Sequence, residues 1–549
     1  MKEIVLNIIF ICVIIPRISS AQSANSFYDA FNSFSADSIR KHLYVLGNDS
    51  LEGRGVGLIG CEKAALYIEK QFEKYGLKKI GNLNSYFQNI PMHGSIPLSR
   101  SELNIITNDD TLLLDYFRDY FLFRSGQQTF IPTSLPLVFV GYGIVAPEFD
   151  YNDYQSVNVE GKIVVYLDGE PYSNNENYFD GSLPTIYSYS ESKRRIALSR
   201  GAAGTIEIPV NNFESWEKFQ RDFSFEDVTL AYSVSSSLSL LINPEIGELI
   251  FNGSKYSFNQ IIEMNKTNKI ESFQLKSKLK FRGSFKERDF ISSNVIGMIE
   301  GSNEQLKDSY LIISAHYDHL GIGPVINGDS VYNGVLDNAA GVSVLLELAR
   351  TFSLLKNKPE RSLVFIATTG EEKGLLGSIY YTDHPAVPLY KTIADINIDG
   401  TAMFKDFKSL VCVGCEMTTL QQYLLASFEK YGLELQEIPS RFNSFDAFNK
   451  SDQLAFALAG IPSILILEGS RNRSKTEDNV IGSFIDYYIN IYHTPFDDLN
   501  QQIDTEAALR HAKIIFDLAF DLLNSKQTPE WNKGTQFINA RLRSIAEKK

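Results

Sequence analysis

Cysteine is scarce in this sequence, with four residues among 549. Cys12 lies in an apolar run at the N-terminus, which leaves Cys61, Cys412 and Cys415. Cys412 and Cys415 have the spacing of a metal or redox pair, but a single pair of this kind is a weak signal. They lie in an apolar stretch typical of a strand, in which alternation points the two thiols at opposite faces. We therefore expect them to be buried structural cysteines.

Positive charge is also in short supply. The chain has 52 Lys and Arg residues against 66 Asp and Glu residues, a net charge of −14. This balance argues against nucleic acids and anionic membrane surfaces as partners. The apolar content of 44% and charged content of 21% are ordinary for a globular protein. The length indicates two to four domains with ample material for a large core.

Long apolar runs are missing beyond the N-terminus. Lys2 precedes an apolar run over residues 4–15, and small residues follow at 19–21. This is the layout of a cleavable secretory signal, residues 1–21, with cleavage near Ala21. The run is short for a membrane span, and an N-terminal anchor is the alternative. We expect a periplasmic or secreted protein with no stable membrane span after cleavage.

Several catalytic signatures are absent as well. The sequence contains no G-x-S-x-G and no H-E-x-x-H, which excludes the serine hydrolases with a nucleophile elbow and the zincins. Gly141 and Gly143 lack the third glycine of a dinucleotide-binding loop.

Two kinds of segment divide the chain. Residues 126–287 contain short apolar runs bounded by Gly, Pro and Asp, which predict a separate β-rich domain. From Val295 onward, apolar strands alternate with helices, as in Tyr310 to Ala315 followed by Ala339 to Leu355. This alternation predicts an α/β fold with a central, mixed but largely parallel sheet flanked by helices. We expect it to be one discontinuous domain, residues 22–125 and 288–549, that carries the β-rich segment as an insertion.

Acidic and histidine side chains stand at the ends of the predicted strands. They are His316, Asp337, Glu371, Glu372 and Asp399, with His493 on a distant loop. The carboxyl ends of parallel strands meet at one edge of a sheet, where ligands bind. Carboxylates gathered there repel one another unless cations neutralise them. The pattern therefore predicts a centre for divalent metal ions.

The ligand types favour zinc, because two imidazoles with carboxylates and no thiolates suit it better than calcium or magnesium. The five residues His316, Asp337, Glu372, Asp399 and His493 are too many for one tetrahedral ion. They suit two Zn²⁺ ions bridged by a carboxylate and a water. Of the adjacent glutamates, one can ligate while the other takes a proton from that water. Asp318 is placed to orient an imidazole. His319 has no such partner set, and we expect it to be structural or solvent-facing.

These motifs resemble the aminopeptidase family with co-catalytic zinc ions, which also contains glutamate carboxypeptidase and the transferrin receptor. The resemblance covers about residues 40–525. The matching segments are 316–321, 337–341, 370–372, 397–399 and 492–495, with residues 49–55 as the N-terminal loop. The resemblance implies that Asp337 bridges two zinc ions, that His316 and Asp399 belong to different ions, and that Glu371 is the general base.

The resemblance extends to the inserted segment. Residues 138–147 and 160–164 are similar to a protease-associated (PA) domain inserted at the same place. Gln453 stands where relatives often carry a histidine, which puts the family's substrate contacts there in doubt.

The implied function is an aminopeptidase that acts on peptides with Glu371 and Asp318 in catalytic roles. A carboxypeptidase or dipeptidase of the same fold is the first alternative and would need a cationic pocket for a substrate carboxylate. A non-catalytic binding protein is the second, and it would have lost metal ligands. A cyclase of this fold with a single zinc ion is the third alternative, and it would need fewer metal ligands than this sequence contains.

Overall fold

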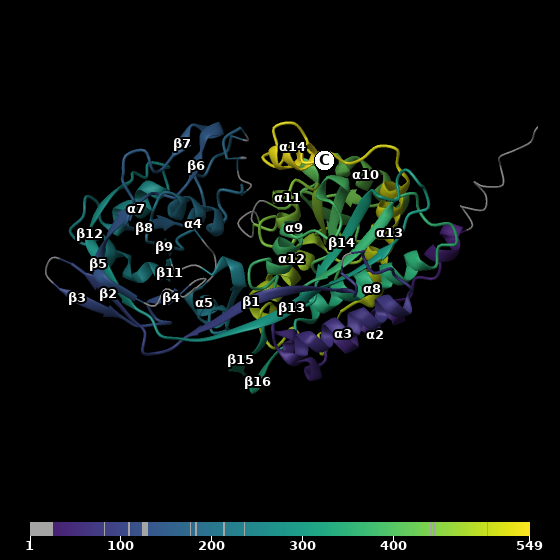
Figure 1. Ribbon diagram of the computed structural model, residues 1–549, viewed down its shortest axis with the longest axis horizontal. Helices are drawn as coiled ribbons and strands as arrows, with labels where there is room; N and C mark the ends of the chain where they lie inside the picture. The colour runs from purple at the N-terminus through teal and green to yellow at the C-terminus, as the bar shows by residue number, and fades with distance from the viewer. Residues whose placement is uncertain are drawn as a thin grey trace, which may run out of the picture.

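The computed structural model describes residues 26–548, apart from residues 82, 108–109, 123–129, 176, 180, 182–183, 212–214, 235–236, 440–441, 443–445 and 502. The predicted signal sequence, residues 1–21, lies outside the described residues. Two β-sheets organise the chain, and each has its own layer of helices (Figure 1).

The larger sheet has nine strands. In spatial order they are β10 (Asp227–Leu230), β1 (Phe87–Pro97), β13 (Phe285–Ile299), β17 (Ser362–Thr368), β14 (Tyr310–His316), β18 (Thr392–Asn397), β21 (Ser463–Glu468), β19 (Ser409–Val413) and β20 (Glu434–Leu435). The four strands from β17 to β21 run parallel, and antiparallel pairings flank them on both sides. The predicted mixed α/β fold is confirmed.

Helices cover both faces of this sheet. One face packs against α2 (Ala36–Leu46), α3 (Ile59–Lys74), α8 (Ala340–Ser353), α10 (Leu420–Tyr431) and α13 (Thr505–Asn524). The other face packs against α9 (Leu376–Asp383) and α11 (Gln453–Leu458). In α13 the buried residues include Ala508, Ala512, Ile515, Ala519 and Leu522, which are three or four positions apart, and the Asp504 side chain caps the first turn. Strands such as β14 and β17, covered on both faces, are continuous apolar runs for this reason.

The smaller sheet has eight strands. In spatial order they are β3 (Thr111–Leu114), β2 (Glu102–Ile106), β12 (Phe273–Arg282), β5 (Phe130–Phe139), β8 (Ile163–Leu167), β9 (Gly204–Ile208), β11 (Leu238–Ile242) and β4 (Tyr120–Leu122). Its helices are α4 (Ser190–Ser199), α5 (Trp216–Asp222), α6 (Gly247–Phe251) and α7 (Phe258–Asn265). A separate apolar core lies on this sheet.

The two sheets exchange segments around the predicted insertion, residues 126–287. Strands β2, β3 and β4 of the smaller sheet precede residue 126. Strand β10 comes from within the insertion but pairs with β1 in the larger sheet. The long strands β1 and β13 run side by side from one half of the molecule to the other (Figure 1). Among the described helices, none is long and apolar enough to cross a lipid bilayer.

The expectation that Cys412 and Cys415 point at opposite faces of a strand is wrong. The two cysteines form a disulfide with their Cα atoms 5.5 Å apart. Strand β19 ends at Val413, and Gly414 adopts a left-handed conformation with φ of 91°. The chain therefore turns before Cys415, and alternation along a strand no longer applies.

Candidate metal centre

The predicted ligands come together beyond the carboxyl ends of β14, β17 and β18. His316 is the last residue of β14 and lies opposite Thr368 of β17, so Glu371 and Glu372 follow directly beyond it. Asp399 follows the end of β18, the neighbour of β14 on its other side. Asp337 lies in the turn that precedes α8. The parallel register therefore brings residues from distant parts of the sequence to one edge of the sheet.

Asp337 presents its two carboxylate oxygens to two different histidines. His316 Nε2 lies 3.2 Å from Asp337 Oδ1 and 3.2 Å from Asp399 Oδ1. His493 Nε2 lies 3.5 Å from Asp337 Oδ2 and 3.1 Å from Glu372 Oε2. The five residues thus form two groups of three that share Asp337. His316 and Asp399 lie in the same group, so the expectation that they belong to different ions is wrong.

The spacing of these atoms fits zinc. Two ligands of a tetrahedral zinc ion with bonds of 2.0–2.1 Å lie about 3.3 Å apart. The four separations above, from 3.1 to 3.5 Å, are close to that value. Within the described part of the chain, the ion-pair partners of these carboxylates are histidines. The site therefore gathers more negative charge than side chains neutralise, as a cation-binding site does.

The charges of the site shift the pKa values of its histidines upward. Burial alone would lower the pKa of His316, but the carboxylates of Glu371 and Asp399 raise it well above its ordinary value. Burial also opposes the shift at His493, where Glu372 and Asp222 raise the pKa. In the absence of a cation, the surrounding carboxylates thus favour the protonated form of both imidazoles.

Glu371 stands beside the two groups of ligands. Its Oε2 lies 4.0 Å from His316 Nε2, farther than the other carboxylate contacts of that nitrogen. Burial, together with Glu372 and Asp399, raises the pKa of Glu371 well above its usual range, against the effect of His316. A carboxylate with a raised pKa beside a metal pair is suited to accept a proton from water.

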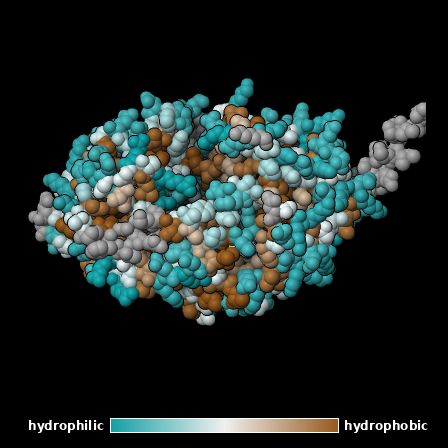
Figure 2. Space-filling view, viewed as in Figure 1, coloured by the Kyte–Doolittle hydropathy of each residue, from teal (hydrophilic) through white to brown (hydrophobic). Residues whose placement is uncertain are grey.

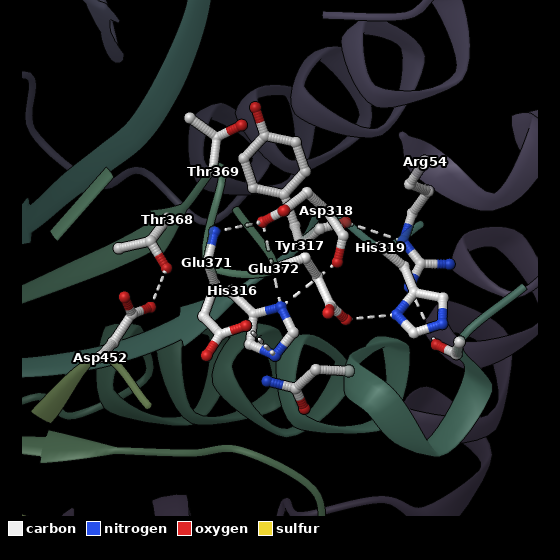
Figure 3. A network of polar contacts seen from close by, with 12 residues as sticks. Arg54, His316, Tyr317, Asp318, His319, Thr368, Thr369, Glu371, Glu372 and Asp452 are labelled. Carbon is white, nitrogen blue, oxygen red and sulfur yellow. Dashed lines mark hydrogen bonds and ion pairs between the residues drawn. The ribbon is translucent and has the colours of Figure 1, made fainter. Parts of the chain in front are cut away.

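Asp318 lies on the Nδ1 side of the His316 ring, whereas Asp337 and Asp399 lie near Nε2. The ring nitrogen Nδ1 of His316 is 3.2 Å from the main-chain oxygen of Asp318 and 3.9 Å from its carboxylate. The carboxylate accepts a hydrogen bond of 3.2 Å from the backbone N–H of Glu371 (Figure 3). Burial raises the pKa of Asp318 to about 7. Asp318 therefore holds both His316 and the Glu371 backbone in place.

His319 is fully buried, so of the two expectations for it, structural or solvent-facing, the structure supports the structural one. Its Nδ1 lies 2.5 Å from Glu372 Oε1 (Figure 3). The same nitrogen lies 4.0 Å from Asp337 Oδ2. Its ring is packed edge-on against that of His493, 5.6 Å away between centroids. Sequence reasoning missed this contact, although His319 stands three residues after His316 in the same segment.

Arg54 ties together the loops that carry the ligands. Its guanidinium is buried and donates hydrogen bonds to four main-chain oxygens, at 2.5 to 2.9 Å. The acceptors are those of Leu46, Tyr317, Asn333 and Gly334. Tyr317 follows His316 in the chain, and Asn333 and Gly334 come shortly before Asp337. The sequence marks residues 49–55 as a loop but does not indicate this role of Arg54.

The loop around His493 supplies another anchor. The Asp497 carboxylate accepts backbone hydrogen bonds from Leu336 at 2.8 Å and Asp337 at 3.1 Å, and one from the Tyr487 hydroxyl at 3.2 Å. Asp497 is fully buried. Asp497 thus fixes the backbone of Asp337 from a loop that is distant in the sequence.

Gln453 has a structural role, in which its side chain makes hydrogen bonds to neighbouring segments. It is buried, accepts a hydrogen bond of 2.8 Å from Asn397 Nδ2, and donates to the main-chain oxygens of Ala447 and Phe448. The neighbouring Asp452 accepts hydrogen bonds from Ser378 and Thr368, both at 2.5 Å. Gln453 is therefore far better suited to holding the 447–448 loop than to binding a metal.

A cavity of about 790 Å³ opens over the ligands, between the two sheets. Figure 2 shows the molecule hollowed between its two halves, with hydrophobic residues at the edge of the hollow. Asp337, Glu371, Glu372, Asp399 and His493 form part of its wall. Its apolar wall is formed by Phe219, Phe223, Phe225, Leu320, Leu465, Leu467, Phe484 and Tyr488. The shape and the lining of the cavity suit a small molecule or peptide with an apolar side chain and a polar group. The apolar side chain would pack on the apolar wall, and the polar group would lie at the predicted metal-binding residues.

Comparisons with known proteins also match this chain to metal-dependent peptidases. Residues 294–519 match the model of Peptidase family M28. The chain is 27% identical to Aminopeptidase YwaD of Bacillus subtilis over 243 residues, 44% of this chain and 46% of that protein. It is 36% identical to Aminopeptidase NAALADL1 of Mus musculus over 113 residues, 20% of this chain and 13% of that protein. The chain thus spans about half or less of the length of the curated relatives it matches.

Among solved structures, the chain is similar to an aminopeptidase from Aneurinibacillus sp. strain AM-1. The TM-score is 0.54 at 19% sequence identity, and the match covers 93% of this chain and 97% of that one. This likeness shows the fold alone.

Proposed function

We propose that this chain, whose residues 294–519 belong to peptidase family M28, is a zinc-dependent exopeptidase that releases N-terminal residues from peptides. The observation that carries the proposal is Asp337, whose oxygens face His316 and His493 separately. A carboxylate shared in this way suits two metal ions. The named aminopeptidase relatives support an aminopeptidase, although they align over only part of their length.

Glu371 has the role of general base in this proposal. The zinc pair would supply an activated water and compensate the charge that develops on the peptide oxygen. Glu371 would take the proton of that water and pass it to the leaving amine nitrogen. His316, Asp337, Glu372, Asp399 and His493 would hold the two Zn²⁺ ions. Asp318 would act on His316 and on the Glu371 backbone instead of on the substrate.

The cavity suggests the kind of substrate. Phe484 and Leu467 belong to an apolar wall that continues from the metal centre. Burying an apolar side chain there stabilises the complex by about 1.5–3 kcal/mol. We propose that peptides beginning with a large apolar residue are preferred.

Two features of the chain support a role outside the cytoplasm. The disulfide between Cys412 and Cys415 is typical of oxidising compartments. The predicted signal at residues 1–21, with cleavage near Ala21, has the matching layout. We propose that the mature protein is periplasmic or secreted. We also propose that the inserted segment, predicted at residues 126–287, is a PA domain built on the eight-stranded sheet.

A dipeptidase or carboxypeptidase is a second candidate, because a lysine lines the cavity directly beside Glu372. Lys373 is partly buried, and burial lowers its pKa against the effect of Asp227 and Glu372. A cation there could receive the carboxylate of a short substrate. A non-catalytic binding protein is disfavoured, because the ligand set and Glu371 are all present.

The test replaces Glu371 by glutamine, which cannot accept the proton. We expect Glu371→Gln to retain two zinc ions per chain. Its kcat toward an aminoacyl anilide should fall by about 10²–10⁴-fold. Zinc is measured by mass spectrometry, and hydrolysis by released anilide before and after chelation. Glu304→Gln, in an exposed ion pair with Lys307, is the matched control and should behave as wild type.

Each outcome of this test separates the candidates. Near-normal activity of Glu371→Gln would remove Glu371 from the reaction. Two zinc ions in wild type without anilide hydrolysis, but with cleavage of free dipeptides, would favour the second candidate. A wild-type protein that binds no zinc under zinc-replete conditions would overturn the proposal.

A further inference from the structure

Helix α5, which belongs to the inserted segment, packs on the loop that carries His493. Lys218 of α5 places its Nζ 5.4 Å from the ring centroid of Tyr492 and 5.5 Å from that of Tyr488. The Tyr492 ring in turn stacks on the His493 ring, with centroids 3.8 Å apart. In Figure 1, α5 lies in the middle of the molecule, between the two sheets. The inserted segment therefore reaches the metal centre through a continuous stack of side chains.

Asp222 is the last residue of α5, and its two oxygens have different neighbours. Its Oδ2 accepts a hydrogen bond of 3.3 Å from Lys218 Nζ. Its Oδ1 faces His493 Nδ1 at 3.8 Å. Both Oδ1 and Nδ1 are buried, and neither has a hydrogen-bond partner within the described part of the chain. Two buried polar atoms thus face each other with no other partner to satisfy them.

Metal binding at His493 would require a hydrogen bond between these two atoms. His493 Nε2 is the nitrogen that faces Asp337 and Glu372, so a metal ion would bind there. A metal-bound imidazole is neutral and keeps its proton on the other nitrogen, Nδ1. That proton needs an acceptor, which also fixes the orientation of the ring and makes the ligand more basic. Asp222 Oδ1 is in place to be that acceptor.

We propose that Asp222 is a positioning residue for His493, so that the inserted segment completes a metal centre whose predicted ligands all lie outside that segment. The inference rests on the proposed function, because His493 needs this partner only when a metal ion is bound. It also gives the insertion a role in metal retention beyond that of a lid or an interaction module.

The experiment measures zinc affinity, by competition with a chromogenic chelator, in wild type and two variants at Asp222. We expect Asp222→Ala to weaken one of the two zinc sites by about 10–100-fold, as loss of an outer-shell carboxylate does. Asp222→Asn keeps an acceptor oxygen without the charge, and we expect a smaller loss of several-fold. Glu217→Gln lies on the exposed face of the same helix and should retain wild-type affinity.

A second readout separates positioning from general destabilisation. The protein with cobalt(II) in place of zinc should show a changed visible spectrum in Asp222→Ala, because the orientation of one imidazole has changed. The chelated proteins are compared by thermal unfolding, which should be the same for Asp222→Asn and wild type. If Asp222→Ala does not fold, the zinc affinity and cobalt spectrum of Asp222→Asn test the inference on their own.

Wild-type zinc affinity and an unchanged cobalt spectrum in the Asp222 variants would overturn the inference and leave the proposed function intact. Absence of zinc binding in the wild-type protein would instead overturn the proposed function itself.

Discussion

Glu372 has a different histidine against each of its carboxylate oxygens. His319 Nδ1 lies 2.5 Å from Oε1, and His493 Nε2 lies 3.1 Å from Oε2. Two ligands of one zinc ion stand about 3.3 Å apart, so the shorter contact is a hydrogen bond and the longer one suits a shared metal. His319 therefore donates to Glu372 and leaves a single oxygen of that carboxylate for the ion.

This arrangement predicts how variants of His319 behave. Alanine removes the donor, and we expect zinc affinity to fall by about 10–100-fold at one site. Asparagine can place its Nδ2–H₂ near the position of the histidine Nδ1–H, so His319→Asn should recover most of that loss. Isothermal titration with zinc measures both. An equal loss in the two variants would mean that the imidazole itself, rather than the hydrogen bond, is what the site requires.

Single residues show where sequence reasoning succeeds and where it stops. That His316, Asp337 and Asp399 come together is predictable, because each stands at the end of an apolar strand or the start of a helix. Arg54 and Asp222 are not, because their roles depend on which loops the fold brings near them. Asp222 lies far from His493 in sequence and on a helix of the inserted segment, and no local pattern indicates that pairing.

At the scale of elements, the start of α8 is held by one asparagine. Asn338 Oδ1 accepts hydrogen bonds from the backbone N–H groups of Gly341 at 3.0 Å and Gly400 at 2.9 Å, and its Nδ2 donates to the Ile398 oxygen at 2.8 Å. The segment of Asp337 is thereby joined to the segment of Asp399. Gly341 leaves the room for this contact, because a Cβ there would lie 2.0 Å from Asn338 Oδ1.

A substitution at Gly341 should therefore disturb the metal centre through α8. We expect Gly341→Ala to lower the free energy of unfolding by about 1–3 kcal/mol, since the overpacked Asn338 must move. Gly482 is the matched control, since it lies in α12 (Glu477–Asp486) and its Cβ would meet nothing within 4 Å. Gly482→Ala should be neutral or slightly stabilising. Urea denaturation of both variants, followed by circular dichroism, gives the comparison. A Gly341→Ala protein as stable as wild type would show that Asn338 is free to shift.

Whole elements were more predictable than their junctions. The apolar run from Tyr310 predicts β14, and its buried, uninterrupted character follows from helices on both faces. The disulfide of Cys412 and Cys415 was missed because Gly414 ends the strand between them, and one left-handed residue changes where every later side chain points. The same limit applies to β10, whose pairing with β1 places part of the insertion in the larger sheet.

On the scale of the whole molecule, the metal centre lies where the two sheets face each other. The inserted segment contributes Asp222 and the apolar residues Phe219 and Phe225 to the cavity over the ligands. The predicted ligands lie beyond strands of the larger sheet and on the loop of His493. A metal ion held there would stabilise contacts in both halves, so we expect its binding to be visible as stability of the entire chain.

That coupling predicts a stabilisation by zinc that depends on pH. Free zinc at about 1,000 times its dissociation constant adds about 4 kcal/mol to the free energy of unfolding. The raised pKa values of His316 and His493 mean that, in the metal-free protein, both imidazoles still hold protons at pH values where free histidine is neutral. Zinc must displace those protons, so its affinity falls as pH falls, by about tenfold per pH unit for each proton displaced.

Thermal unfolding of chelated and zinc-loaded protein between pH 8 and pH 6 measures this effect. We expect the difference in unfolding temperature between the two forms to shrink steadily toward pH 6 at constant total zinc. The sign follows from competition: lower pH favours the protonated imidazoles and therefore the metal-free form. Buffer and ionic strength are held fixed, and magnesium serves as the control ion, since two histidines do not suit it. A zinc-dependent shift of the same size at both pH values would mean that the two histidines are not the groups that release protons to the metal.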